Sequence, residues 1–134
     1  MLIKEIVNTR VVKHALATGK AGQPGQCFRN VVAPSVPDDQ LIGYGTVSDG
    51  KETVPHAFFL DDQGNVHEPT IMKDQKYAMM KGSKIDHLTY TINGSIKKKD
   101  LKVPPPSGDG TKDWKQRELA IAKLAGVKGK NDAN

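Results

Sequence analysis

Residues 41–71 read LIGYGTVSDGKETVPHAFFLDDQGNVHEPTI, and this stretch decides the fold class. Two of its runs, Leu41–Val47 and Thr53–Leu60, are short and rich in β-branched and aromatic residues, which is typical of strands. The turn-forming sequence SDGKE separates them, and Asp62–Asn65 is a second turn that leads into a third run, Val66–Ile71. The pattern predicts an antiparallel meander of three strands.

The segments on either side of this stretch predict two more strands and two helices. Residues 85–92 alternate weakly, and Asn93-Gly94 is a strong hairpin signal, so SIKKKDLKV is expected to return as a strand. Near the N-terminus, Gly19 stands where a helix would end, after apolar residues at three- and four-residue spacing. These are Leu2, Ile3, Ile6, Val7, Val11, Ala15 and Leu16. CFRNVVA, before Pro34, predicts a second short helix that starts at Cys27.

The C-terminal quarter predicts a linker, a helix and a tail. Residues 104–110 are rich in Pro and Gly and suit neither a helix nor a sheet. Residues 111–126 predict a helix, with Thr111 as its cap, Trp114 on its apolar stripe and Gly126 at its end. Residues 127–134 are expected to be a disordered tail. The predicted fold is α+β, with N-terminal helices packed on a small antiparallel sheet in a domain of residues 1–103, followed by the C-terminal helix.

Length and composition exclude several classes of protein. The 134 residues suit a single domain, and one cysteine permits neither an intrachain disulfide nor a cysteine-rich zinc site. No segment approaches the roughly 20 apolar residues that cross a bilayer, and the N-terminal segment lacks the apolar stretch of a secretory signal. We therefore expect a soluble, cytoplasmic protein with no membrane partner and no cofactor.

The positive charge is a weak indication of nucleic-acid binding. The chain has 20 Lys+Arg against 15 Asp+Glu, and most of the excess lies in the last third. Aromatic residues make up only 5 % of the chain, which leaves few rings for stacking on bases. We expect a solvated basic region, and a nucleic acid is not the expected partner.

Three residues could together perform nucleophilic catalysis. Cys27 is expected at a helix N-terminus, which stabilises a thiolate. Alternation in the second predicted strand places His56 on one face with Phe58 and Leu60, where its imidazole could act as a general base. Glu68 follows on the next predicted strand and could accept a hydrogen bond that orients the ring. Either of the turn residues Asp61 and Asp62 could orient it only if the strand bulged.

The sequences GQCFRNV around Cys27, PHAFFLDDQGNV around His56 and HEPT around Glu68 resemble the transglutaminase-like branch of the papain-type cysteine enzymes. The order and the spacing carry the resemblance: 29 positions separate Cys27 from His56, and 12 separate His56 from Glu68. The match runs from Cys27 to Thr70 and implies a papain-like core with a Cys-His-Asp triad. The aspartate of that family stands just before Pro-Thr, where this chain has Glu68.

Acyl transfer also needs donors for the oxyanion, each of which lowers the barrier by about 3 to 4 kcal/mol. The backbone N–H of Cys27 is one candidate donor, and the side chains of Gln23 and Gln26 are others. In the papain-type group a glutamine upstream of the cysteine has this role, which favours Gln23, although the spacing here is shorter than in that group.

The expected function is that of a cysteine-dependent acyl-transfer enzyme, which could be an amide hydrolase, a peptidase or transglutaminase-like. It would act on a protein or peptide substrate through a Cys-His-Glu triad and a thioester. One alternative is a non-catalytic binding or regulatory protein on the same scaffold, in which Cys27 is a buried small side chain. A second is a basic nucleic-acid-binding protein. No metal site is expected, because His67 and Glu68 face opposite sides of a strand and could not share an ion with His56.

Overall fold

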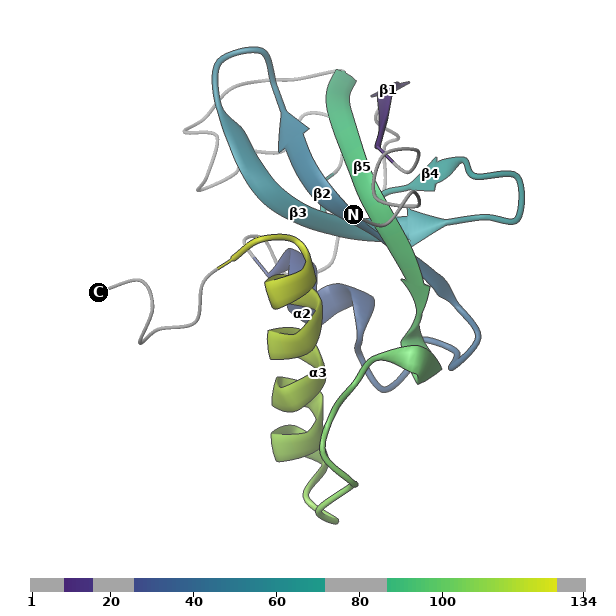
Figure 1. Ribbon diagram of the computed structural model, residues 1–134, viewed down its shortest axis with the longest axis vertical. Helices are drawn as coiled ribbons and strands as arrows, with labels where there is room; N and C mark the ends of the chain where they lie inside the picture. Colours follow the sequence, from purple (N-terminus) through teal and green to yellow (C-terminus); the bar gives the residue numbers. More distant parts are fainter. Residues whose placement is uncertain (1–8, 16–25, 72–86, 128–134) are drawn as a thin grey trace, which may run out of the picture.

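A curved antiparallel sheet forms the centre of the molecule in the computed structural model, which describes residues 9–15, 26–71 and 87–127 (Figure 1). Its strands are β1 (Arg10–Ala15), β2 (Leu41–Ser48), β3 (Thr53–Leu60), β4 (Val66–His67) and β5 (His87–Lys97), and their order is β1-β5-β2-β3-β4. The sheet is nearly closed, because His14 of β1 and Val66 of β4 line the same small pocket. The helices of the described residues are α2 (Cys27–Val31), a 3-10 turn (Lys98–Asp100) and α3 (Gly110–Leu124).

The predicted fold class is wrong, and with it the implied papain-like core, because the described residues form mainly a nearly closed antiparallel sheet of five strands. N-terminal helices on a small sheet were expected, but among the described residues only the five-residue α2 precedes the meander, and the long helix α3 is C-terminal. The end of the predicted N-terminal helix is strand β1, which pairs with β5. Val12 and His14 are half-buried while their neighbours in β1 are exposed, so the strand period of two overrides the helical spacing. The rest of that predicted helix lies outside the described residues.

The predicted hairpin at Asn93-Gly94 is also wrong, because β5 runs through this dipeptide without turning. Gly94 pairs with Tyr44 and Ile92 pairs with Gly45, so Asn93 has no partner of its own in β2 and forms a bulge. The extra residue shifts the alternation of side chains by one. Ile92 therefore packs on one face of the sheet and Ile96 on the other.

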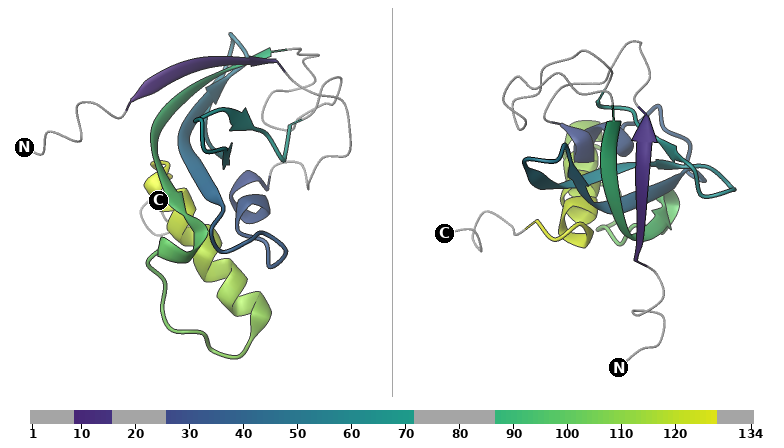
Figure 2. Two further views of the ribbon diagram at one scale, coloured as in Figure 1. Left: turned by 90° about the vertical axis from the view of Figure 1, so that its right-hand side faces the viewer. Right: turned by 90° about the horizontal axis from the view of Figure 1, so that it is seen from above.

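Two core clusters cover the two faces of the sheet. The inner cluster consists of Val47, Phe58, Leu60, Val66, Ile71, Leu88, Tyr90 and Ile92. The helix cluster joins the opposite face to the helices and consists of Val31, Val32, Ile42, Ala57, Leu101 and Ile121. In Figure 1, α2 and α3 lie together on one side of the sheet, and Figure 2 shows the same arrangement from two further directions.

The C-terminal helix has the predicted position and a different cap. The side chain of Asp109, rather than that of Thr111, accepts hydrogen bonds from the backbone N–H groups of Thr111 and Lys112. Gly126 has a positive φ of 92° just beyond the helix, as a terminating glycine requires. Within the part of the chain that the structure describes, no helix is both long and apolar enough to span a membrane.

The third predicted strand is shorter than expected. Only Val66 and His67 pair with β3, opposite Leu60 and Phe59. After His67 the chain leaves the sheet in a turn through Pro69, and this turn places the Glu68 side chain against the sheet.

Candidate active site

Cys27 is the first residue of α2 and is 4 % exposed. Because β4 pairs with only the last two residues of β3, α2 can pack against the remainder of that strand. The amide of Asn30 donates to Thr70 Oγ1 at 2.9 Å, which ties the cysteine helix to the turn that carries Glu68. The helix is therefore held both to the strand that carries His56 and to the turn after β4.

Contacts with α3 also hold the cysteine helix in place. The indole N–H of Trp114 donates to the backbone oxygen of Arg29 at 3.0 Å, and the Arg29 guanidinium lies 3.8 Å from the centre of the indole ring. Arg29 also lies 3.8 Å from Glu118, in an ion pair that is partly exposed. The docking of α3 through Trp114 therefore fixes α2 in place.

His56 lies in β3 and is completely buried. Alternation directs it to the same face as Phe58, and the two rings stack with centroids 6.0 Å apart. In the pairing of β2 with β3, Gly45 stands opposite His56 and Gly43 opposite Phe58. A side chain at Gly43 would overlap the Phe58 ring, so a glycine at this position makes room for the aromatic layer around the histidine.

The Glu68 carboxylate is bound to the imidazole of His56. Its Oε1 lies 2.6 Å from His56 Nε2, and the side chain of Glu68 is only 2 % exposed. Its other oxygen, Oε2, accepts hydrogen bonds from the backbone N–H groups of Thr70 at 2.9 Å and Ile71 at 3.1 Å. The carboxylate thus closes the turn after β4 and orients the histidine with the same side chain.

The surroundings favour the charged forms of both partners. Burial by itself would lower the pKa of His56, but the charge of Glu68, the thiol of Cys27 and the hydrogen bond that the ring donates to Glu68 outweigh it and raise the pKa to about 10. Burial by itself would raise the pKa of Glu68. The charge of His56 and hydrogen bonds from His56, Tyr90 and the Thr70 backbone outweigh it and hold that pKa below its ordinary value. The pair is therefore a buried imidazolium and carboxylate.

The thiol of Cys27 is the second polar neighbour of the imidazole. It contributes to the raised pKa of His56. Because Nε2 is occupied by Glu68, Nδ1 is the nitrogen that is available to the sulfur. Nδ1 makes no well-formed hydrogen bond with any described residue. The thiol of Cys27 therefore lies near the ring without a well-formed hydrogen bond to Nδ1.

One residue of the site was not found from the sequence. Tyr90, in β5, is fully buried, and its hydroxyl donates to Glu68 Oε1 at 2.5 Å. Its ring packs edge-on against Phe58 with centroids 4.8 Å apart. A tyrosine in an alternating strand is typical of a core residue, so its sequence context carries no signal for contact with a residue 22 positions away.

Gln23 and Gln26 are the other expected site residues. Gln23 lies outside the described residues. Gln26 precedes α2 and is exposed, and its side chain does not cap the helix. The backbone N–H of Cys27 remains a candidate oxyanion donor. Asp61 organises the turn between β3 and β4, accepting from the backbone N–H groups of Gln63 and Asn65, and does not contact His56.

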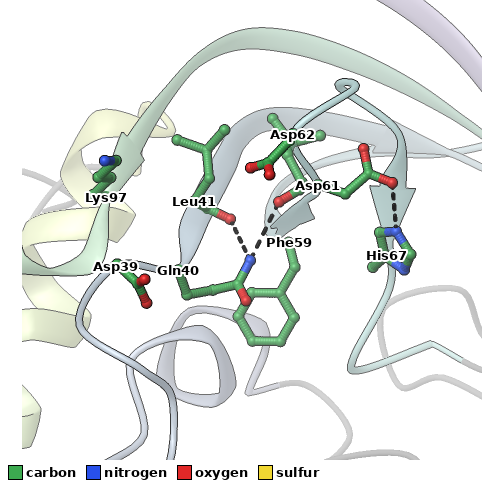
Figure 3. A pocket seen from close by; sticks show the side chains of 9 residues that line it. Asp39, Gln40, Leu41, Phe59, Asp61, Asp62, His67 and Lys97 are labelled. Carbon is green, nitrogen blue, oxygen red and sulfur yellow. Dashed lines mark hydrogen bonds and ion pairs between the residues drawn. The ribbon is translucent and has the colours of Figure 1, made fainter.

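A surface pocket of about 610 Å³ lies at the end of β3, away from Cys27 and His56 (Figure 3). Asp39 and Lys97 lie on one side of it, and Asp61 and Asp62 lie on the other. His67 Nε2 lies 2.9 Å from Asp61, and this contact contributes most to lowering the pKa of Asp61 to about 2. His67 is thus paired with Asp61, and no group of three or more metal-ligating side chains occurs among the described residues.

One lysine of the expected basic region, Lys98, is buried and not solvated. Lys98 is 7 % exposed, and its ammonium group donates to the backbone oxygens of Ala33 at 2.9 Å and Val36 at 2.8 Å. Lys98 therefore supports the loop after α2 and is not part of a basic surface.

Comparison with known proteins identifies no relative: no family model, curated protein or solved structure matches the chain.

Proposed function

We propose that the protein is a cysteine-dependent acyl-transfer enzyme in which Cys27 is the nucleophile, His56 the general base and Glu68 the residue that orients the imidazole. The observation that carries the proposal is the buried pair of His56 Nε2 and Glu68 Oε1, 2.6 Å apart, with the thiol of Cys27 as the other polar neighbour of the ring. Burying an ion pair in a small core costs desolvation free energy. Such a pair therefore points to a role other than stability.

The chemistry follows from the protonation of the ring. With Glu68 bound to Nε2, the imidazolium holds on Nδ1 the proton given up by the Cys27 thiol, and the thiolate of this ion pair attacks the carbonyl carbon of an amide or ester. The C–N or C–O bond breaks, His56 returns the proton to the leaving group, and a thioester remains on Cys27. Water or an amine then attacks the thioester, while Nδ1 accepts the proton of this second nucleophile.

A protein or peptide substrate is part of the proposal and rests on the resemblance of the three short motifs to papain-type enzymes. A cytoplasmic location is also part of it, because thiols remain reduced there and Cys27 has no other cysteine with which to pair. The triad serves either acyl acceptor, water or an amine.

The first test measures the reactivity of Cys27, the single thiol of the chain. Iodoacetamide should alkylate it rapidly in the folded protein near neutral pH, and His56→Ala should slow the reaction by at least about tenfold. His67→Ala is the matched control, because His67 is an exposed histidine on the neighbouring strand that pairs with Asp61. Cys27 of the His67→Ala variant should be alkylated at the wild-type rate.

The second test follows the acyl-enzyme itself. With p-nitrophenyl acetate, the protein should release p-nitrophenolate in a burst and carry an acetyl group on Cys27, detected by mass spectrometry of the digested protein. A thiol that reacts with either reagent only after denaturation would contradict the proposal and favour the non-catalytic scaffold.

A further inference from the structure

Two side chains converge on one oxygen of the Glu68 carboxylate. His56 Nε2 lies 2.6 Å and the Tyr90 hydroxyl 2.5 Å from Oε1, while the backbone N–H groups of Thr70 and Ile71 bind Oε2. A carboxylate has about four lone-pair sites, and these four donors occupy them. Three of the donors come from β3 and the turn that follows β4, and only Tyr90 comes from β5, across the sheet.

We propose that Tyr90 is a positioning residue of the active site, which holds Glu68 ionised and oriented so that His56 keeps its proton on Nε2 and presents Nδ1 to Cys27. This inference rests on the proposed function and adds to it a fourth residue, outside the Cys-His-Glu set.

Counting protons supports this role. A protonated Glu68 would bring a fifth hydrogen to an oxygen pair that already receives four, so one of the existing bonds would have to break. The backbone donors are fixed by the turn, and the histidine has to donate for catalysis. The Tyr90 hydroxyl is therefore the donor that makes protonation of Glu68 unfavourable without constraining the imidazole.

The ring of Tyr90 is held so that its hydroxyl cannot turn away. It packs against Phe58 at 4.8 Å, against His14 at 5.8 Å and against His56 at 6.0 Å between ring centroids. A fully buried ring in this contact has little rotational freedom. The hydroxyl is thus preorganised toward Glu68.

The charged and titratable groups around Glu68 come from four elements. His56 faces it from β3 and Tyr90 from β5. His14 of β1 interacts with its charge, and burial lowers the pKa of His14, so this ring is neutral near neutral pH. Cys27 of α2 lies beyond the imidazole. Among the described residues, Tyr90 is the one whose hydrogen bond can be deleted without altering a charge.

The test is the pH profile of iodoacetamide alkylation at Cys27 in Tyr90→Phe. This substitution keeps the ring and removes the donor. A hydrogen bond to a charged group shifts the pKa of that group by about one unit. Without the Tyr90 donor, Glu68 should take up a proton at higher pH. The acid limb of the profile should therefore move up by about one pH unit, with alkylation about tenfold slower on that limb. Tyr44→Phe, which removes a hydroxyl from the opposite face of the same sheet, should leave the limb unchanged.

Three outcomes would overturn the inference. A Tyr90→Phe profile that superimposes on that of the wild type, while Glu68→Gln suppresses alkylation, would reject the role of Tyr90 and leave the proposed function intact. A rate reduced by the same factor at every pH would show a merely structural role for Tyr90. A wild-type Cys27 that resists alkylation in the folded protein would reject both.

If Tyr90→Phe fails to fold, a second variant tests whether the Tyr90 hydroxyl sets the acid limb. Tyr90→3-fluorotyrosine, introduced at that position alone, has almost the same shape and a more acidic, stronger donor. It should move the acid limb to lower pH, and an unchanged limb would count against the proposal.

Discussion

Replacing Glu68 by Gln tests the buried ion pair most directly. Gln has the same shape as Glu68, but it carries no charge and exchanges one acceptor oxygen for an NH₂ group. Its oxygen could still accept from His56 and Tyr90, and its NH₂ would then face the backbone N–H groups of Thr70 and Ile71. The NH₂ group and the backbone N–H groups are all donors, and the side chain at this position is only 2 % exposed, so little water can separate them. The variant should therefore lose both the charge pair and the closure of the turn.

The magnitude follows from burial. Removing one partner of a buried pair leaves the other uncompensated and costs about 3 to 5 kcal/mol. The raised pKa of His56, from 6.5 to about 10, points to a coupling of the same order. The total stability of a domain of this size is about 5 to 15 kcal/mol. Glu68→Gln should therefore remove a large share of it.

Urea denaturation at pH 6, followed by tryptophan fluorescence from Trp114, measures this loss. Glu118→Gln is the matched control: it makes the same substitution in the partly exposed pair with Arg29, where about 0 to 1 kcal/mol is expected. If Glu68→Gln costs less than about 1 kcal/mol, or no more than Glu118→Gln, the description of a buried charged pair is wrong.

The pH dependence of wild-type stability gives an independent check. Because the pKa of His56 is raised, its contribution is complete below the ordinary value of 6.5 and is lost as the pH rises through about 10. Because the pKa of Glu68 is lowered, its contribution is present above the ordinary value of 4.5 and is lost as the pH falls through the lowered value. Stability from the pair should peak between these ordinary values and decline toward pH 10, and Glu68→Gln should flatten the decline.

Three further substitutions test the scaffold around the site by chemical denaturation. A Cβ at Gly45 would overlap the backbone oxygen of Thr91, so Gly45→Ala should cost about 3 kcal/mol or more by forcing β2 and β5 apart, and a near-neutral result would argue against the bulged register. Trp114→Phe removes the bond to Arg29 and should cost about 1 to 2 kcal/mol, whereas a loss under about 0.5 would mean that α3 docks without it. Lys98→Met leaves two carbonyl oxygens without their donor and should cost about 1 to 3 kcal/mol; a stabilising effect would refute the supporting role of Lys98.

Local signals predicted several individual elements, although the predicted fold class was wrong. The strand predicted at 53–60 matches β3 residue for residue, and the strand predicted at 41–47 is one residue short of β2. The turn between them and the C-terminal helix with its terminating glycine were also evident from neighbouring residues. Each depends on contacts within a few positions, which composition and periodicity record.

Long-range pairing decided the features that were predicted wrongly. Val11 and Val12 suit either a strand or a helical stripe, and pairing with β5 selects the strand. Asn93-Gly94 suits a two-residue hairpin, yet β2 is long enough to pair with both halves of β5, so the dipeptide becomes a bulge instead. Tertiary contacts override local preference in both places.

The candidate site shows the same division. The sequence alone determined which residue types are present and in what order: one thiol, a histidine in a strand between apolar residues, and a carboxylate 12 positions later beside a proline. Only the tertiary structure decided that Glu68 is buried and hydrogen-bonded to Nε2 of His56. It also decided that α3 holds the cysteine helix through Trp114, and that Tyr90 is the fourth donor to the carboxylate. The physical reason is that spacing along the chain limits which neighbouring strands can meet. Burial and the direction of a hydrogen bond depend instead on side chains that come from every part of the sheet.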